Sequence, residues 1–325
     1  MSRISYKDAV MVAIREEMER DSTICLIGID APSSLAGLDE GFKKEVGKDR
    51  IIHTPLSEQG FTGMAIGAAM AGLRPIVEYN GNTLQYAAME QLVSQAGKGR
   101  YRSGGQINIP LVVRVVRTKD SMGVHENDNA YANLLQMGLK VIVPATPADA
   151  KGLVKQAIRD QDPVIIYEPA LCYDMIDNVP DEEYTIPLGL AEIKHEGSDL
   201  TVVAVGHLVN TVFEIAKDLE SKEISIEVID PRTLFPLDVK AILQSVQKTG
   251  KLVIVDDGSR FCGFASEVAA IISETGFSYL KAPIKRITRA QIPVPYSRQL
   301  VKEVIPQREE IIKAISSLVN ISDKL

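Results

Sequence analysis

Residues 54–78 read TPLSEQGFTGMAIGAAMAGLRPIVE, and this stretch decides the fold of the first half of the chain. A turn containing Pro55 leads to Glu58, and a helix rich in Gly and Ala follows over residues 60–72. A short strand then runs from Arg74 to a second carboxylate, Glu78. Small residues let a neighbouring backbone approach closely. We therefore predict that Glu58, at the start of the helix, is enclosed where two subunits meet.

Strand and helix patterns alternate on both sides of this stretch. Apolar runs predict strands at 23–28, 75–79, 111–116, 140–143 and 164–167, with helices near 6–20, 58–72, 85–101, 129–137 and 147–160. The last helix has a clear start, because Thr146 can cap it, Pro147 suits its first turn and Asp149 favours its positive end. Such alternation predicts an α/β fold with a parallel sheet covered on both faces.

The segment 173–199 interrupts this alternation. It is acidic, contains proline and is only weakly periodic, so we interpret it as a connection between domains. Further on, strands are expected at 200–205, 224–229, 252–255 and 284–286, with helices near 209–220, 238–247 and 263–275 and a closing helix from about 298. We predict two domains, 1–180 and 199–325, joined by a linker at 181–198.

The composition excludes several classes of protein. The chain has 325 residues, of which 45% are apolar, and a formal net charge of -7. An acidic chain does not favour a non-specific nucleic-acid binder, which needs a basic face. The first residues form no hydrophobic signal segment, and no apolar run reaches the roughly 18 residues of a membrane span. Three scattered cysteines lack metal-ligand spacing and indicate a reducing compartment, so we expect a cytoplasmic protein without membrane contact.

Two residues are candidates for catalysis. Glu58 could be an ordinary acid in the first turn of a helix, or a carboxylate that shares a proton with a ring nitrogen, since Leu56, Phe61 and Met64 would surround it with apolar groups. His125 lies in the polar loop TKDSMGVHENDNAY, where it could be simply solvated or could move protons near neutral pH. No HxxxH, CxxC, GxSxG, GxGxxG or phosphate-binding GxxxxGK[ST] pattern occurs.

Longer motifs point to a family. They are residues 54–78, YRSGG at 101–105, GLKVIVPATPADAKGL at 138–153, DPV at 162–164, EVIDPRTLFPLD at 227–238, and PVPYSRQL and IPQREEIIKAI near the end. With these motifs the chain resembles the β subunit of thiamine-diphosphate-dependent 2-oxo acid dehydrogenases over nearly its whole length. The resemblance implies two three-layer αβα domains, namely a thiamine-diphosphate pyrimidine-binding domain and a transketolase C-terminal-like domain.

The resemblance also implies roles for individual residues. Glu58 matches the glutamate that hydrogen-bonds N1′ of the cofactor aminopyrimidine, and His125 matches an active-site histidine implicated in proton transfer and in acyl transfer to lipoamide. Leu56 matches a wall of the pyrimidine pocket. In the family, backbone carbonyls of a stretch that corresponds to residues 157–162 bind potassium. This chain keeps Ala157, Asp160 and Asp162 there, so a potassium site is implied, and oxygen ligands suit such a hard cation.

The implied assembly is a heterotetramer. The chain lacks the GDG…N signature for Mg²⁺ and diphosphate, which the family carries on its α subunit. Thiamine diphosphate is therefore expected to be shared with an α subunit in an α2β2 assembly. The C-terminal domain is implied to form the β–β dimer contact and to dock a lipoyl acyltransferase core.

Several positions depart from the family pattern. In the segment YNGNTLQYA, Asn80 and Leu84 take the places of a Met and of a Phe that stacks on the pyrimidine, and Leu84 supplies apolar contact without ring stacking. The family's His-Ser-Gln becomes His125-Glu126-Asn127, and its Gly-Ala becomes Arg289-Ala290. The reacting pocket is thus altered while the scaffold is kept.

These departures leave more than one function open. The main hypothesis is decarboxylation of a 2-oxo acid with transfer of the acyl group to lipoamide. A second hypothesis keeps the thiamine chemistry without a lipoyl complex, as in a carboligase, an acetoin-cleaving enzyme or a biosynthetic acyl-transfer enzyme. A non-catalytic scaffold is a third, which the presence of both Glu58 and His125 disfavours.

Overall fold

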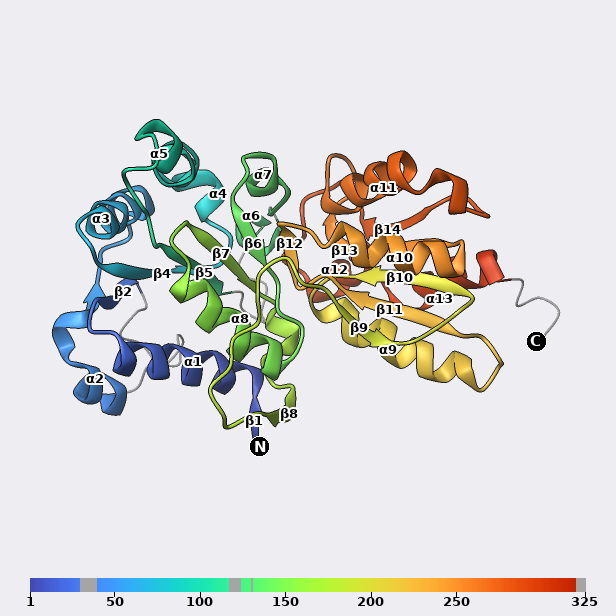
Figure 1. The fold of residues 1–325 in the computed structure, drawn as a ribbon, viewed down its shortest axis with the longest axis horizontal. Coiled ribbons are helices and arrows are strands. Elements are labelled where there is room, and N and C mark those ends of the chain that lie inside the picture. The colour runs from blue at the N-terminus through green and yellow to red at the C-terminus, as the bar shows by residue number, and fades with distance from the viewer. Residues whose placement is uncertain (30–39, 117–123, 130, 320–325) are drawn as a thin grey trace. The chain divides into compact units, whose positions relative to one another are not determined.

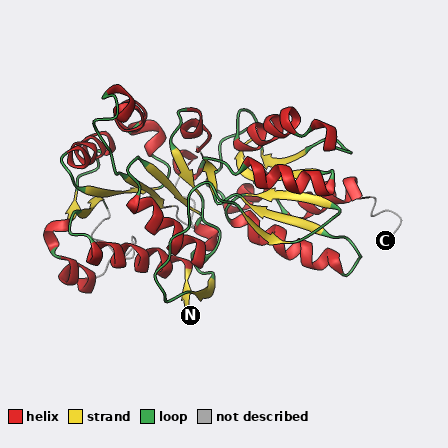
Figure 2. Cartoon of the chain, viewed as in Figure 1, coloured by secondary structure: helices red, strands yellow, loops and turns green. Residues whose placement is uncertain are grey.

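A computed structural model describes residues 1–29, 40–116, 124–129 and 131–319 of the chain. A few side chains within these ranges, including those of Asn80 and His125, lie outside the described part. The chain divides into two compact units, each built of helices and strands (Figure 2). Unit 1 comprises Met1–Asn127 and Asn133–Leu188, and unit 2 comprises Asp128–Ala132 and Gly189–Leu325.

Unit 1 is a sheet between two layers of helices (Figure 1). Its elements are β1 (Ser2–Ser5), α1 (Tyr6–Arg20), β2 (Ile24–Gly28), α2 (Glu40–Val46), β3 (Ile51–His53), α3 (Glu58–Met70), β4 (Arg74–Asn80), α4 (Leu84–Ala87), a π-helix (Glu90–Ala96), α5 (Gly97–Arg102), β5 (Val112–Val116), α6 (Val124–Asn127), α7 (Tyr131–Gln136), β6 (Lys140–Ile142), α8 (Pro147–Arg159), β7 (Val164–Glu168) and β8 (Ile176–Val179).

The strands that unit 1 contributes to its main sheet run in parallel in the order β6-β7-β5-β4-β2-β3, and β1 and β8 form a separate antiparallel pair. Because parallel connections are right-handed, the helices divide between the two faces of the sheet. In Figure 1, α1 and α8 lie along one face, and α3, α4 and α5 cover the other. The core between the sheet and the α1–α8 layer is apolar, and includes Ala13, Ile14, Ile24, Leu26, Ile76, Val112, Leu153, Val154 and Val164.

Helix α8 begins where the sequence predicts. The Thr146 hydroxyl accepts a hydrogen bond from the Asp149 amide at 3.2 Å, and Pro147 occupies the first turn. Helix α1 starts in the same way, since Ser5 caps it by accepting from the Asp8 amide at 3.1 Å. Each cap satisfies a backbone donor that the first turn of a helix leaves unpaired.

Unit 2 repeats the layered arrangement. Its elements are β9 (Glu192–His195), β10 (Leu200–Ala204), α9 (His207–Glu220), β11 (Ile226–Asp230), β12 (Thr233–Phe235), α10 (Val239–Thr249), β13 (Leu252–Ser259), α11 (Phe264–Thr275), β14 (Lys285–Arg289), α12 (Arg298–Val304) and α13 (Arg308–Val319). The sheet order is β14-β13-β10-β11-β9, with only β9 antiparallel to its neighbour. Helices α10 and α11 lie on one face, and α9 and α13 lie on the other (Figure 1). The predicted class, α/β with two three-layer domains, is confirmed.

Three details differ from the sequence predictions. The helix expected over 85–101 is divided into α4, a π-helix and α5, and its middle follows π geometry rather than α geometry. The closing helix is two helices, because Pro306 separates α12 from α13 and a proline cannot continue a helix. The segment predicted as a linker, 181–198, contains strand β9.

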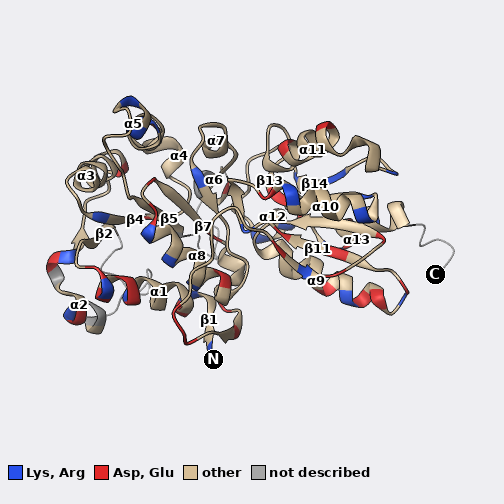
Figure 3. Ribbon diagram, viewed as in Figure 1, with Lys and Arg blue, Asp and Glu red and all other residues tan. Residues whose placement is uncertain are grey.

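Basic and acidic residues both occur along the helices, as the blue and red segments of the ribbon in Figure 3 show. None of the described helices combines the length and the apolar composition that a membrane-spanning helix needs.

Candidate active site

The predicted active-site residues come from one edge of the sheet of unit 1. Leu56 and Glu58 follow β3, Asn80 ends β4 with Leu84 just beyond it, and His125 lies in α6 after β5. All three strands are parallel, so their carboxyl ends share an edge, and α/β sheets bind ligands at that edge.

Glu58 is the first residue of α3 and is half-buried. Beneath this turn, the buried rings of Phe61 and Tyr79 pack with centroids 5.4 Å apart, and the Tyr79 and Thr62 hydroxyls share a hydrogen bond. Burial raises the pKa of Tyr79, and the nearby Glu58 carboxylate raises it further, while the bond to Thr62 opposes both. No prediction from the sequence covered this Thr62–Tyr79 pair. The tyrosine directly after Glu78 was the feature that could have indicated it.

The apolar enclosure expected around Glu58 is incomplete in the chain by itself. Phe61 is buried, but Leu56 is 76% exposed and Met64 is 46% exposed. That these three side chains surround Glu58 with apolar groups where two subunits meet stays a prediction. Leu84, predicted to contact the cofactor, is fully buried as the first residue of α4.

Two predicted site residues can be placed only through their backbones. His125 belongs to the short helix α6, and Asn80 is the last residue of β4. Their side chains lie outside the described part of the structure.

Glu78 is part of a buried ionic cluster. The Arg114 guanidinium donates to Glu78, and it donates to Glu168 in a bidentate pair at 2.6 and 3.1 Å. The three side chains come from adjacent strands β4, β5 and β7, and each is at most 4% exposed. Burial by itself lowers the pKa of Arg114, but the two carboxylates outweigh it and raise the pKa. These contacts make Glu78 a structural partner of Arg114.

A second buried acidic pair, Asp256 and Asp257, lies in β13 of unit 2. Burial raises the pKa of Asp256 to about 6, and the neighbouring charge of Asp257 adds to the effect. Hydrogen bonds from the Tyr131 hydroxyl and the Gly258 amide oppose the rise. No prediction from the sequence covered this pair, although two adjacent acids directly after an apolar strand were its signal.

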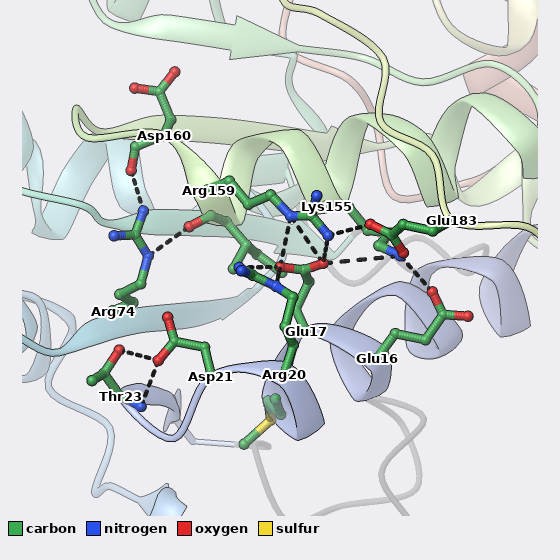
Figure 4. Close-up of polar contacts among 12 residues, drawn as sticks. Glu16, Glu17, Arg20, Asp21, Thr23, Arg74, Lys155, Arg159, Asp160 and Glu183 are labelled. Carbon is green, nitrogen blue, oxygen red and sulfur yellow. Dashed lines mark hydrogen bonds and ion pairs between the residues drawn. The ribbon is translucent and has the colours of Figure 1, made fainter.

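The stretch implied to bind potassium lies where α8 ends and β7 begins (Figure 4). The Arg74 guanidinium donates to the carbonyls of Ile158 at 2.9 Å and Asp160 at 2.5 Å. The carboxylate of Asp160 is held by Lys140 at 2.8 Å, so its side chain is already paired. A carbonyl oxygen has two lone pairs, so each carbonyl that accepts from Arg74 keeps one further acceptor site.

Ion pairs connect the C-terminal part of α8 to α1. The buried Glu17 carboxylate accepts hydrogen bonds from Nε and Nη2 of Arg159, and Lys155 pairs with Glu16 at 2.6 Å (Figure 4). Among the described residues, no group of three or more His, Cys, Asp or Glu side chains could hold a metal ion.

Comparisons with known proteins agree with this architecture. The model described as "Transketolase, pyrimidine binding domain" matches residues 2–174, and "Transketolase, C-terminal domain" matches residues 189–311. A solved structure titled "Split gene transketolase, inactive beta4 tetramer" aligns with a TM-score of 0.80 and 20% identity, covering 98% of this chain and 99% of that one. Fold and site thus define a two-domain transketolase-like protein.

Curated relatives specify the family. The 2-oxoisovalerate dehydrogenase subunit beta of Bacillus subtilis is 40% identical over 98% of this chain and 99% of its own length. The acetoin:2,6-dichlorophenolindophenol oxidoreductase subunit beta of the same organism is 39% identical, covering 97% of each chain. The pyruvate dehydrogenase E1 component subunit beta of Rickettsia bellii is 36% identical over 97% of this chain and 98% of its own. The chain belongs to the family of β subunits of thiamine-diphosphate-dependent 2-oxo acid dehydrogenases.

Proposed function

We propose that this chain is the β subunit of an enzyme that decarboxylates a 2-oxo acid and passes the acyl group to lipoamide, and that it works only with an α subunit. One observation carries the proposal: Glu58 begins the glycine-rich helix α3 at the carboxyl edge of the sheet, in a chain similar to such β subunits along its whole length.

The residues at this edge fit the pyrimidine end of thiamine diphosphate. When bound, this cofactor supplies a carbanion centre and accepts the electrons released on decarboxylation. The half-buried Glu58 carboxylate would hold a proton against a pyrimidine nitrogen, which a general acid–base group must reach directly. The exposed side chain of Leu56, next to that turn, would be covered by the cofactor and by the α subunit. Mg²⁺ would be held by the α subunit with the diphosphate.

The role of Glu58 is tested by Glu58→Gln in the complex of the chain with its α subunit. The amide keeps the size of the side chain but cannot share a proton, so turnover should fall at least 100-fold with the melting temperature unchanged. CO₂ release from a panel of 2-oxo acids is the measurement. Turnover within threefold of the parent would remove Glu58 from catalysis.

His125 is proposed to act after decarboxylation, in the acyl transfer. The His125→Ala variant should lower the rate of lipoyl-domain acylation more than tenfold while thiamine diphosphate binds as before, measured by fluorescence titration. Equal acylation rates for variant and parent would exclude this role.

The second hypothesis, a thiamine enzyme without lipoamide, has one observation in its favour: a 39% identical relative is named for acetoin oxidation with an artificial acceptor. The panel assay distinguishes the two, because dependence of turnover on added lipoyl domain supports the main proposal. Acetoin cleavage without that dependence supports the alternative.

Potassium is proposed to bind the carbonyls of Ala157, Asp160 and Asp162. Of these three carbonyls, that of Asp160 accepts from Arg74 and that of Ala157 accepts from the Asp160 amide at 3.2 Å, and each keeps a second lone pair. If the site binds potassium, replacing Na⁺ with K⁺ at constant ionic strength should raise the melting temperature. An identical melting temperature in the two salts would exclude it. We further propose an α2β2 assembly with a β–β contact, and docking of unit 2 on a lipoyl acyltransferase core.

A further inference from the structure

The hydroxyl pair of Thr62 and Tyr79 lies one helical turn from Glu58. Thr62 follows Glu58 by four residues in α3, so the two side chains share a face of the helix. That face is the buried one, as the buried residues of the helix show: Phe61, Thr62, Ala65, Ile66 and Ala69. Side chains of a helix tilt toward its N-terminus, so the Thr62 hydroxyl leans toward the turn that begins at Glu58.

Tyr79 holds this hydroxyl from the sheet. It is the last residue but one of β4, its side chain is 1% exposed, and its ring packs on that of Phe61. Its hydroxyl shares a hydrogen bond with that of Thr62, which is fully buried. Burial raises the pKa of Tyr79, and the Glu58 carboxylate is near enough to raise it further. The phenol therefore keeps its proton at neutral pH.

A count of hydroxyl hydrogens leaves one donor unused. Two hydroxyls carry two hydrogens, and the bond between them uses one. Within the described part of the chain, neither Thr62 nor Tyr79 has a further hydrogen-bond partner, and the Glu58 carboxylate makes no hydrogen bond. A buried donor without an acceptor costs free energy, and a carboxylate is a stronger acceptor than a neutral oxygen. The pair thus offers a hydrogen one turn away from an unused acceptor.

We propose that Thr62 and Tyr79 are positioning residues for Glu58, with Tyr79 donating to Thr62 and Thr62 donating to the Glu58 carboxylate. The inference rests on the function proposed above, in which this carboxylate shares a proton with the cofactor. The phenol is the more acidic hydroxyl and the better donor, so it leaves the Thr62 hydrogen for the carboxylate. A carboxylate held through one oxygen presents the other in a fixed direction, and proton transfer needs such precision.

Near-isosteric variants separate the two hydroxyls. Thr62→Val removes the donor to Glu58 and keeps the branched shape, whereas Tyr79→Phe keeps the ring and removes the hydroxyl that orients Thr62. Thr62→Ser keeps a hydroxyl at position 62. Tyr6→Phe is the matched control, because Tyr6 is also fully buried and its hydroxyl donates to the Pro144 carbonyl at 3.3 Å. Its helix, α1, lies on the other face of the sheet from α3 (Figure 1).

The first measurement needs no activity. Carbodiimide coupling of an amine to protonated carboxyls is followed against pH in the full chain, and mass spectrometry gives the pH at which half of Glu58 is labelled. Glu58 is the only acid between residues 51 and 74, so fragment ions from this stretch report it alone. A carboxylate that loses a hydrogen-bond donor is protonated at higher pH, so this pH should rise by roughly 0.5 in Thr62→Val and by less in Tyr79→Phe. It should not change in Tyr6→Phe.

The second measurement is CO₂ release by the complex with the α subunit, on the 2-oxo acid that the parent uses best. Thr62→Val loses one hydrogen bond to a charged group, so kcat should fall about tenfold with KM within twofold. Tyr79→Phe should lower kcat about threefold. Because the two hydroxyls act in series, the variant with both changes should lose no more than Thr62→Val. Thr62→Ser should restore most of kcat, and Tyr6→Phe should match the parent.

The variant with both changes also separates positioning from stability. Each single change leaves one buried hydroxyl without its partner, whereas the two changes together remove both hydroxyls and should recover part of the melting temperature. Positioning predicts that kcat stays low in this variant. A kcat that returns to the parent value there would overturn the proposal, because the pair would then serve stability only.

An unchanged labelling pH in both Thr62→Val and Tyr79→Phe would overturn the contact with Glu58. A raised labelling pH with unchanged kcat would overturn positioning, as would a loss that appears only in KM or that Thr62→Ser does not restore. If Thr62→Val does not fold, Tyr79→Phe carries both measurements. A parent complex without turnover on any 2-oxo acid would instead refute the proposed function. Positioning for that reaction would fall with it, and the labelling would still decide whether the pair contacts Glu58.

Discussion

Replacing the buried Asp256 with asparagine should change how stability depends on pH. The pKa of Asp256 is raised from its ordinary 3.8 to about 6 by burial and by Asp257. Because the native pKa lies above the unfolded one, the native state loses stability as pH rises from 3.8 to 6. At 1.36 kcal/mol per pKa unit the ionised carboxylate costs the fold about 3 kcal/mol at pH 7.5.

The Asp256→Asn variant removes this cost but adds a smaller one. The amide oxygen can still accept from Tyr131 and Gly258, as Oδ1 does in the parent. Oδ2 of Asp256 is buried with no hydrogen-bond partner, so an amide nitrogen there would be an unpaired donor costing about 1–3 kcal/mol. The variant should therefore be about 0–2 kcal/mol more stable than the parent at pH 7.5. At pH 5.0, where most of the parent carboxyl is protonated, this advantage should shrink by about 1.4 kcal/mol.

Native-state hydrogen exchange of the β13 amides, corrected for intrinsic rates, gives the opening free energy of unit 2 at each pH. The charged neighbours that share this environment are Asp257 and His207, whose Nδ1 lies 4.0 Å from Oδ2 of Asp257. Tyr131→Phe is a control of opposite sign, because losing the hydroxyl raises the pKa of Asp256 further and enlarges the cost at pH 7.5. A variant-minus-parent difference that stays constant between pH 5.0 and 7.5 would refute the reasoning.

Two further predictions concern unit 1 and the cysteines. Arg114→Met leaves Glu78 and Glu168 buried without their cation, so it should cost about 3–5 kcal/mol and lower the melting temperature of the chain by roughly 10 °C. A melting temperature within 2 °C of the parent would show that water or a neighbouring group replaces the guanidinium. Cys262 is exposed, whereas Cys25 is buried and burial raises its pKa, so a maleimide should label Cys262 first. Mass spectrometry of the native chain that found Cys25 modified first would contradict the described burial.

Much of unit 1 follows from signals between neighbours in the sequence. The cap at Thr146 and the proline that follows it place the start of α8 correctly, because capping depends on residues within one turn. The glycine-rich helix begins at Glu58, as predicted. The alternation of strand-like and helix-like hydrophobic patterns, with periods of 2 and 3.6 residues, is sufficient to predict the α/β class. These signals need no knowledge of how the chain packs.

Other features depend on contacts between residues far apart in the sequence, which no local pattern contains. The register of β4, β5 and β7 brings Arg114 between two carboxylates, and this makes Glu78 a structural ion-pair partner. Asn129 and Asp257 are separated by 128 positions, yet one hydrogen bond joins them, and residues 128–132 belong to unit 2. The pKa of Asp256 is likewise a property of its buried surroundings. Burial and register are set only when the whole chain packs, so the tertiary structure alone decides them.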